Sequence, residues 1–383
     1  MPFVPIAIVG RSCLLPGASS PAQLWDLVDA ERDSISAVPA DRWRVAPEQV
    51  VCPPSRPRPD ATWSDRGSYV RGFSDIFDPA GFELPASEIL ELDPLFQWLL
   101  HTAREALSDS QHRGERRRVG AVFGNLGFPS AELSAFAESV WLGSEARPAA
   151  RNRFCSGLPA LLLERALGLG GGCFALDAAC ASSLYAIKIA CDWLAEGRRD
   201  LVLAGAVNCA DDLFIHVGFS ALQALSKTGR SRPFHAAADG LVPAEGAGFV
   251  ALKRLTDAEQ AGDRILGVIR GVGLSNDGRG KGALVPSAEG QARAMRAALE
   301  QSGLTASDIS LMECHATGTT LGDATELESM AQVYAGRAEP LPIGSLKSNL
   351  GHLITAAGVA GLIKVLEAMR HRTGPATFLR RTT

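Results

Sequence analysis

Cys180 is the residue best placed in this sequence for nucleophilic chemistry. It follows CFALDAA (173–179), which is typical of a buried strand, and it precedes ASSLYAIKIACDWLAEG (181–197), which is typical of a helix. We therefore expect Cys180 in a sharp turn at a helix N-terminus. Unpaired backbone N–H groups and the helix dipole favour a thiolate there and can also hold an oxyanion. The alternative is a buried structural cysteine, and the small residues on both sides favour the reactive one.

Two histidines lie in comparable turns further along the chain. His315 ends the apolar segment ISLMECH (309–315), and the hydroxyls of Thr317 and Thr319 follow at alternate positions. His352 ends GSLKSNLGH (344–352), which also carries Lys347. Open α/β sheets bind ligands at the carboxyl ends of their strands, so this placement favours a functional role. Ordinary core or surface histidines and a solvated lysine are the alternatives.

One cysteine with two histidines fits thioester condensation better than hydrolysis. A Cys–His hydrolase needs one base and one group that orients it. A decarboxylative condensation needs two donors for the enolate oxygen that forms when CO2 leaves. Lys347 either orients this set or stays ionised beside an acid such as Glu326.

The elements that must position these residues alternate between strands and helices, which predicts an α/β fold. The apolar character of the strands predicts parallel pairing with both faces covered. Residues 33–88 are proline-rich and irregular, which predicts a surface insertion or an oligomer contact. The predicted strands are 6–10, 117–124, 173–179, 200–208, 247–255, 265–275, 309–315 and 342–348. The first predicted helix begins at Pro21, directly after Ser19 and Ser20, where a serine can cap it. The other predicted helices span 92–107, 181–197, 289–303, 322–336 and 355–369.

Bulk composition is that of a globular protein. The 383 residues are 46% hydrophobic and 21% charged with a net charge of -4, so nothing favours nucleic acid or an anionic membrane. No stretch approaches the roughly 20 apolar residues that span a bilayer. We expect a cytoplasmic protein. The eight cysteines contain no CxxC pair, so neither a disulfide framework nor a metal site is predicted.

The motifs around these residues resemble those of the β-ketoacyl synthase family. LDAACASSL (176–184) matches the family's active-site signature, and ECHATGTTLGD (313–323) and GSLKSNLGH match its two histidine motifs. The opening IAIVGRSCLLPGA (6–18) and the segment 229–255 are similar as well, so the resemblance covers nearly the whole chain. Ala181 and Ala316 replace the serine and glycine of many relatives. The amino-acid sequence of these motifs most resembles that of type I polyketide synthases or of synthases of polyunsaturated fatty acids and glycolipids.

The resemblance implies a role for each residue. Cys180 accepts an acyl group from an acyl carrier protein or coenzyme A, and His315 and His352 promote decarboxylation of a malonyl thioester and stabilise the enolate. Lys347 supports the histidines. Thr317 and Thr319 hold the pantetheine arm of the carrier protein. No metal or permanently bound cofactor is implied, and the phosphopantetheine arm serves as the substrate carrier.

The resemblance also implies an architecture. We expect a thiolase-like fold with two stacked βαβαβαββ halves in five layers, α-β-α-β-α. The N-terminal half, 1–255, carries the cysteine, and the C-terminal half, 256–383, carries both histidines. Family members are homodimers with strands paired across a two-fold axis, and other synthase domains are expected beside this one. Relatives end with a glycine-rich loop that supplies an oxyanion N–H, and its absence predicts a shortened chain with weak condensation.

Several rival functions stay open on the sequence. A non-condensing, chain-length-type dimer partner typically lacks the nucleophile, and a starter-unit decarboxylase normally carries glutamine at position 180. A thiolase, or a synthase acting on coenzyme A thioesters, is disfavoured by the second histidine motif. GAVFGNLG (120–127) lacks the spacing of a dinucleotide loop. The basic run 113–118 is either a solvated face or a docking point for an acidic carrier protein.

Overall fold

A six-stranded mixed sheet forms the centre of the computed structural model, which describes residues 3–40, 42–143, 149–279 and 285–374. Its strand order is β5-β4-β6-β7-β1-β8. The strands are β1 (Ile6–Leu14), β4 (Val119–Gly124), β5 (Cys173–Leu176), β6 (Leu201–Asn208), β7 (Gly246–Arg254) and β8 (Gly267–Ile269). Strand β4 runs parallel to β5 and β6, whereas β7 is antiparallel to both β6 and β1. The prediction of parallel pairing is therefore wrong for residues 247–255, and it is also wrong for 265–275, because β8 pairs antiparallel with β1. Helices cover both faces of the sheet, so the strands are apolar whatever their direction.

Two groups of helices bury the two faces of this sheet. Helices α4 (Pro94–Asp109) and α6 (Leu158–Ala166) cover one face, and α7 (Ser182–Ala195), α13 (Ala357–His371) and α1 (Pro21–Asp29) cover the other. As predicted, Ser20 caps α1 by accepting a hydrogen bond from the Gln23 N–H. Strand residues that alternate in sequence, such as Phe123 and Val122, pack into the two different cores.

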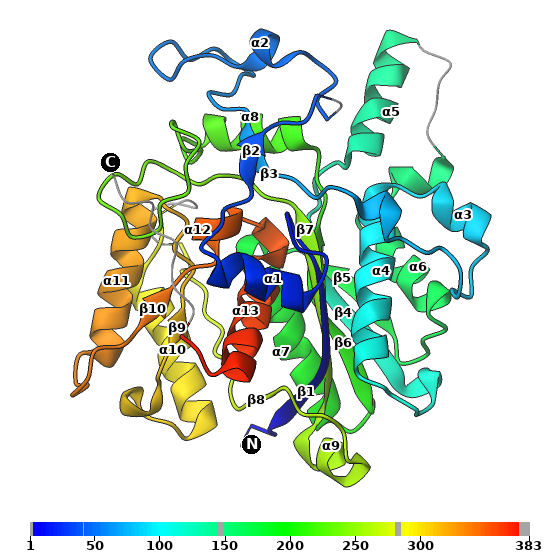
Figure 1. Ribbon diagram of the computed structural model, residues 1–383, viewed down its shortest axis with the longest axis vertical. Coiled ribbons are helices and arrows are strands. Elements are labelled where there is room, and N and C mark those ends of the chain that lie inside the picture. Colours follow the sequence, from blue (N-terminus) through cyan, green and yellow to red (C-terminus); the bar gives the residue numbers. More distant parts are fainter. Residues whose placement is uncertain (1–2, 41, 144–148, 280–284, 375–383) are drawn as a thin grey trace.

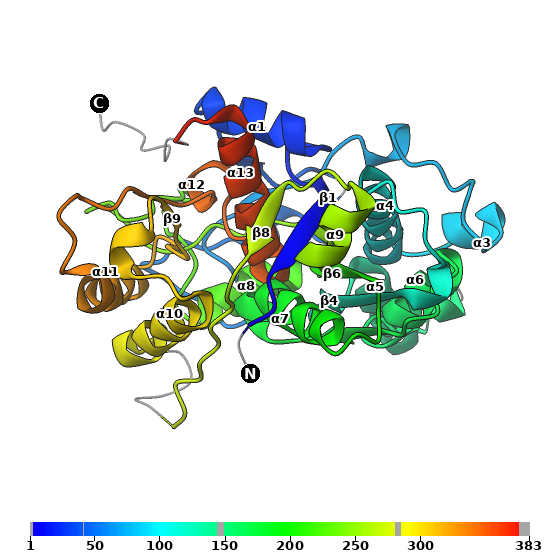
Figure 2. The ribbon, with the colours of Figure 1, turned by 90° about the horizontal axis from the view of Figure 1, so that it is seen from below.

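A second, smaller sheet lies on the far side of α7 and α13. It consists of β9 (Met312–Glu313) and β10 (Ile343–Gly344), which are parallel, and α10 (Ala288–Ser302) and α11 (Thr320–Tyr334) pack on its outer side. The succession of layers is α-β-α-β-α, as expected (Figures 1 and 2). The predicted strands 265–275, 309–315 and 342–348 are too long. In the described residues only two or three positions of each segment pair with a neighbouring strand as β8, β9 and β10. Residue 347 already belongs to the short helix α12 (Lys347–Leu350).

The two predicted halves share one core. Strand β8 pairs with β1, and residues of α13 join the same buried cluster as residues of β1 and α7. The division at residue 255 stays a prediction. No helix in the described part of the chain is both long and apolar enough to cross a bilayer.

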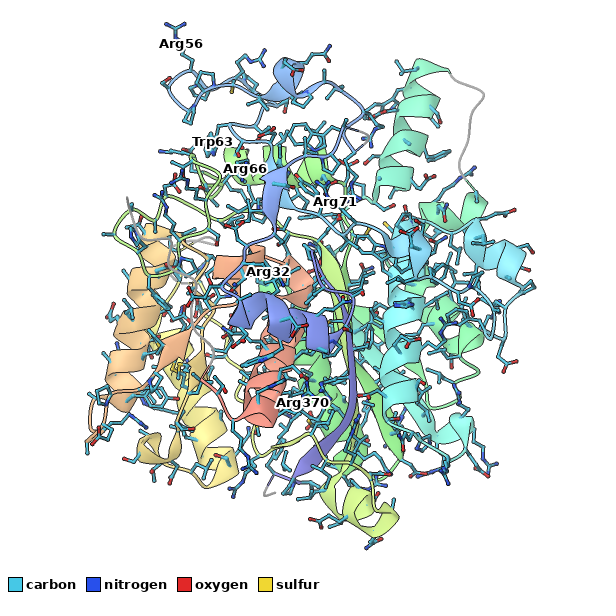
Figure 3. All side chains as sticks on the ribbon, viewed as in Figure 1. Arg32, Arg56, Trp63, Arg66, Arg71 and Arg370 are labelled. Carbon is cyan, nitrogen blue, oxygen red and sulfur yellow. The ribbon has the colours of Figure 1, made fainter. Side chains whose placement is uncertain are left out.

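The proline-rich segment forms an irregular layer over one end of the large sheet (Figure 1). Trp63 Nε1 donates a hydrogen bond to the Leu225 carbonyl at 3.0 Å, and Arg66 Nε donates to the Gly229 carbonyl at 3.3 Å, whereas Arg56 points outward (Figure 3). The segment is therefore attached to the protein at its base, and its role as an insertion or an oligomer contact stays a prediction. The remaining elements are β2 (Ile35–Ala37), β3 (Arg66–Ser68), α2 (Pro47–Val50), α3 (Ala86–Leu90), α5 (Ala131–Leu142), α8 (Asp212–Ala221) and α9 (Leu255–Ala261).

Candidate active site

Folding brings Cys180, His315 and His352 together from distant parts of the chain. Cys180 Sγ lies 2.9 Å from His352 Nε2. The two imidazole rings are nearly perpendicular, with centroids 5.4 Å apart. His352 is buried with 1% exposure, Cys180 is half-buried, and His315 is exposed. The cluster therefore opens to solvent on the His315 side.

A tight turn presents the Cys180 thiol, as the sequence predicted. Residues Ala179–Ala181 form a 3-10 turn directly before α7. Asp177 Oδ1 accepts the Ala179 N–H at 2.9 Å, and Ser182 Oγ accepts the Ala178 N–H at 2.9 Å and donates to the Ala179 carbonyl at 2.7 Å. These side chains fix the turn so that the sulfur faces the histidines.

Each of the three clustered side chains lies within two residues of a strained backbone position. Ala179, Ala316 and Ile354 have φ angles of 49°, 20° and 50°, in the left-handed region that residues with a Cβ rarely adopt. Such a position costs on the order of 1–3 kcal/mol and persists only where the surroundings impose it. Backbone strain therefore concentrates at this site.

Glu326 imposes the turn at His315. Its two carboxylate oxygens accept the N–H groups of His315 and Ala316, each at 2.7 Å. The sequence suggested Glu326 as a partner of Lys347. Its negative charge does favour the ionised form of Lys347, but that of Glu313 does so more strongly. The main contacts of Glu326 are thus with the backbone of the histidine turn.

Lys347 is a buried cation beside the cluster. Burial lowers the pKa of its ammonium group, and the charges of Glu313 and Glu326 partly offset this. Burial also raises the pKa of the Cys180 thiol, with Lys347 and a backbone N–H acting in the opposite direction. Burial therefore opposes the preference for a thiolate that the sequence predicted at this helix N-terminus.

Both histidines are neutral near pH 7. Burial lowers the pKa of His352, with the charges of His315 and Lys347 adding to it. His315 touches solvent on one side, yet the protein around it and the Lys347 charge lower its pKa as well. The buried Nδ1 of His352 has no hydrogen-bond partner within the described residues. A neutral imidazole offers one donor and one acceptor nitrogen, so the pair can both donate hydrogen bonds and accept a proton.

The two predicted pantetheine-binding threonines follow His315 in the same turn. Thr317 is 8% exposed, and its Oγ1 lies 3.1 Å from Thr319 Oγ1. Thr319 directly precedes α11. Both hydroxyls are thus near the exposed His315 side of the cluster.

Cys180 also has apolar neighbours, which the sequence did not reveal. Cys180 packs into a small cluster with the buried side chains of Leu126, Ile215 and Ile354, together with Phe219. These residues come from four separate segments, so no local pattern could have joined them. The Cys180 residue therefore contacts both the His352 imidazole and an apolar cluster.

Glu313 and Lys364 are two further residues that sequence reasoning missed. The fully buried Lys364 Nζ donates to Glu313 Oε2 at 2.7 Å, and Glu313 Oε1 accepts the Leu346 N–H at 2.6 Å. A Cβ on Gly361 would lie 3.1 Å from Glu313 Cγ, so the glycine permits this close approach. The carboxylate connects β9 to α13 and to the turn before Lys347. A lone lysine inside the apolar helix 355–369 was the available signal.

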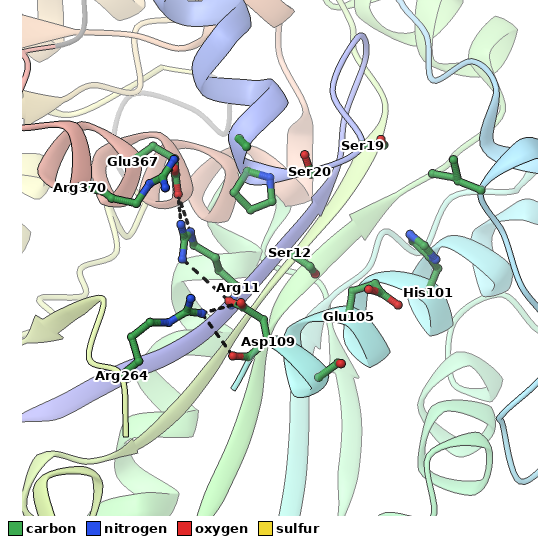
Figure 4. A pocket seen from close by; sticks show the side chains of 14 residues that line it. Arg11, Ser12, Ser19, Ser20, His101, Glu105, Asp109, Arg264, Glu367 and Arg370 are labelled. Carbon is green, nitrogen blue, oxygen red and sulfur yellow. Dashed lines mark hydrogen bonds and ion pairs between the residues drawn. The ribbon is translucent and has the colours of Figure 1, made fainter. Parts of the chain in front are cut away.

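A separate cavity of about 510 Å³ is lined by other residues (Figure 4). Five of its charged side chains, which we call the Arg11 cluster, are Arg11, Asp109, Arg264, Glu367 and Arg370, and Glu105 also lines it. Glu367, with 0% exposure, accepts hydrogen bonds from Arg11 and Arg370, and Asp109 pairs with Arg264 at 2.5 Å. Every charge in this cluster has an opposite charge beside it.

The basic run 113–118 lies at the surface with its charges partly paired. Arg118 Nε contacts Asp200 at 2.6 Å, and Arg117, whose side chain is 77% exposed, contacts Glu115. The carrier-docking alternative for this run stays a prediction.

Comparisons with known proteins agree with the motifs and the fold. Residues 4–258 match the family model "Beta-ketoacyl synthase, N-terminal domain", and residues 266–379 match "Beta-ketoacyl synthase, C-terminal domain". The chain is 39% identical to a mycoketide-CoA synthase of Mycobacterium tuberculosis and to the polyketide synthase GfsA of Streptomyces halstedii. Each match covers 98% of this chain but only 9% and 5% of those proteins, respectively.

Solved ketosynthase structures share the fold. The PfaC keto synthase–chain length factor superposes with a TM-score of 0.94 at 35% identity, covering 99% of this chain and 43% of that one. The ketosynthase from module 6 of the bacillaene synthase of Bacillus subtilis gives 0.83 at 32% identity, covering 99% and 63%. These similarities confirm the predicted thiolase-like α/β fold. Because family models match both halves and solved ketosynthases superpose on almost every residue, the chain belongs to the β-ketoacyl synthase family.

Proposed function

We propose that this chain catalyses the decarboxylative Claisen condensation of a β-ketoacyl synthase, in polyketide or fatty acid biosynthesis. The observation that best supports this proposal is the 2.9 Å contact between Cys180 Sγ and His352 Nε2, with the His315 imidazole beside it. Acyl transfer forms a thioester on Cys180 and releases the carrier thiol. A malonyl thioester then loses CO2, and its carbanion attacks the Cys180 thioester, which yields the β-ketoacyl product and frees the sulfur.

His352 is the base for the first step. The raised pKa of Cys180 means that the sulfur enters the reaction protonated, so a proton must leave as the S–C bond forms. His352 Nε2 is within hydrogen-bond distance of that proton. The departing carrier sulfur takes the proton up, which leaves His352 neutral again for the second step.

Both imidazoles support the second step as hydrogen-bond donors. Decarboxylation places negative charge on the oxygen of the forming enolate, and donors that are already in place stabilise it without reorganisation. Burial keeps both imidazoles neutral by lowering their pKa values, and the Lys347 charge acts in the same direction. Lys347 is thus proposed to tune the histidines from within the protein.

The neighbours of Cys180 suggest how substrates approach. The cluster around Leu126, Ile215 and Ile354 supports an acyl chain beside these apolar side chains. Thr317 and Thr319 support binding of the phosphopantetheine arm of an acyl carrier protein, with no permanently bound cofactor. Strand β5 ends one side of the described sheet, which supports the proposed homodimer through pairing of edge strands. Neighbouring synthase domains are proposed because the curated relatives are far longer than this chain.

Intact-mass measurement of acyl transfer tests the proposal. We expect a single acyl adduct from a panel of acyl thioesters, located on Cys180, and its conversion to product with CO2 release when malonyl carrier protein is added. Cys180→Gln should retain decarboxylation, which a thiolase would lack. Absence of the adduct would contradict the nucleophile assignment, and an adduct without CO2 release would favour a non-condensing dimer partner.

A further inference from the structure

The Cys180 centre also has the composition of a ligand set for a soft metal ion. Its thiol and two imidazoles offer ligand atoms that all lie within 4.8 Å of one another. We propose that Cys180, His315 and His352 bind one Zn²⁺ ion reversibly, and that this ion inhibits the enzyme by occupying the nucleophilic sulfur. The ion is an inhibitor and not a cofactor. The proposal depends on the geometry of the three side chains and not on the condensation reaction.

Small side-chain rotations complete the coordination geometry. Tetrahedral zinc has Zn–S and Zn–N distances of about 2.3 and 2.0–2.1 Å, which places its ligand atoms roughly 3.3–3.8 Å apart. The Sγ–Nε2 contact of 2.9 Å must open slightly, and the widest separation of 4.8 Å must close. His315 is exposed and can turn, whereas the buried His352 provides a fixed ligand.

Three protein ligands make this an exchangeable site. Structural zinc sites are closed by four protein ligands, whereas a site with three keeps one position for water or another small ligand. The exposed His315 side supplies the entry path. One sulfur and two nitrogen ligands favour zinc over the oxygen-seeking ions Ca²⁺ and Mg²⁺. A chelator should therefore remove the ion.

Two features limit the affinity. The Lys347 charge near the cluster repels a divalent cation. His352 Nδ1 lacks an acceptor within the described residues, and metal-bound histidines usually donate their second N–H to one. We therefore expect binding weaker than that of a structural zinc site, and tighter binding in Lys347→Met.

Binding is a simple exchange that blocks the nucleophile. The Zn–S bond forms as the Cys180 thiol loses its proton to solvent, and no oxidation state changes. The sulfur lone pair that would attack a thioester is then held by the metal. Acylation and alkylation of Cys180 should slow together in proportion to zinc occupancy.

Cobalt spectroscopy on the reduced, metal-free chain provides the first test. Co²⁺ should give a thiolate-to-cobalt charge-transfer band that saturates at one equivalent and disappears when Zn²⁺ is added. Cys180→Ser should remove the band, and His315→Ala or His352→Ala should weaken binding at least tenfold. Cys173→Ser, which alters a half-buried cysteine of β5, is the matched control and should retain it. Survival of the band in Cys180→Ser would show adventitious binding and overturn the proposal.

Alkylation of the unmodified chain provides a test that requires no variant. One equivalent of Zn²⁺ should slow iodoacetamide labelling of Cys180 at least tenfold, EDTA should restore it, and Mg²⁺ should have no effect. Labelling of Cys173 serves as the internal control. An unchanged alkylation rate of Cys180 would refute zinc binding while leaving the condensation proposal intact. Protection of the thiol by zinc in a chain that does not condense would support zinc binding and contradict the condensation proposal.

Discussion

The Cys180 centre and the Arg11 cluster treat buried polar groups in opposite ways. In the Arg11 cluster the fully buried Glu367 is paired with two arginines, and Asp109 is paired with Arg264. At the Cys180 centre, His352 Nδ1 is buried without a partner in the described residues, and Lys347 is buried with a lowered pKa. Paired charges stabilise the fold, whereas unpartnered polar atoms and shifted pKa values are typical of functional sites.

Replacing the nucleophile should have the largest effect. Cys180→Ala is expected to abolish the acyl adduct and to lower turnover by about 10⁴-fold or more, as for other covalent catalysts. Intact-mass spectrometry checks the adduct, and thermal unfolding should be little changed. Cys191→Ala in α7, the helix that follows Cys180, is the matched control and should acylate normally. An acylated Cys180→Ala protein would place the nucleophile elsewhere.

Breaking the Arg11 cluster should affect stability instead. Glu367→Gln leaves Arg11 and Arg370 without their shared buried carboxylate, which typically costs about 3–5 kcal/mol of unfolding free energy. Urea unfolding measures this loss. The folded fraction should still acylate Cys180 at the normal rate per molecule. A Glu367→Gln protein that is stable but cannot be acylated would show that the Arg11 cluster serves the reaction and not stability.

The Glu313–Lys364 pair combines both kinds of effect. Lys364→Met removes the buried ammonium group that pairs with Glu313 at 2.7 Å, so unfolding free energy should again fall by about 3 kcal/mol. Because Glu313 also holds the Leu346 N–H before Lys347, decarboxylation should slow more than acyl transfer. Measuring the rates of decarboxylation and acyl transfer in Lys364→Met and in Glu367→Gln checks this. Equal losses of the two rates in Lys364→Met would show that the role of Lys364 is purely structural.

Relieving backbone strain at the site should be nearly neutral. A glycine inside a helix costs about 1 kcal/mol relative to alanine, but Ala316 has a φ of 20° that glycine adopts readily. Ala316→Gly should therefore change unfolding free energy by less than about 0.5 kcal/mol, whereas Ala190→Gly inside α7 should cost at least about 1 kcal/mol. Equal losses in the two variants would mean that the turn at His315 is unstrained.

The pH dependence of Cys180 labelling should show the smallest effect. Burial raises the pKa of this thiol, so the thiolate fraction must keep rising above the pH at which an ordinary thiol, with a pKa of about 8.5, is half ionised. Lys347→Met removes the charge that opposes this shift and should move the labelling midpoint further upward. A midpoint below that of free cysteine would show that the helix N-terminus outweighs burial.

Sequence reasoning succeeded where the signal is local. The strand before Cys180, the turn and the helix after it are contiguous, and the Ser20 cap and the start of α1 follow from neighbouring residues. It failed for strand direction at β7 and for the lengths of β8, β9 and β10, because both depend on partner strands from elsewhere in the chain. The local sequence does not show which strands will pair with one another.

Residue types and spacing by themselves determined that a cysteine turn and two histidine turns exist and that they match one family's motifs. Tertiary structure alone decided that Cys180 and His352, 172 positions apart, meet at 2.9 Å, that Glu313 connects Lys364 to the turn before Lys347, and that burial raises the pKa of the thiol. The physical reason is that proximity and desolvation arise from packing between distant segments, and each residue's own sequence neighbourhood carries no record of them.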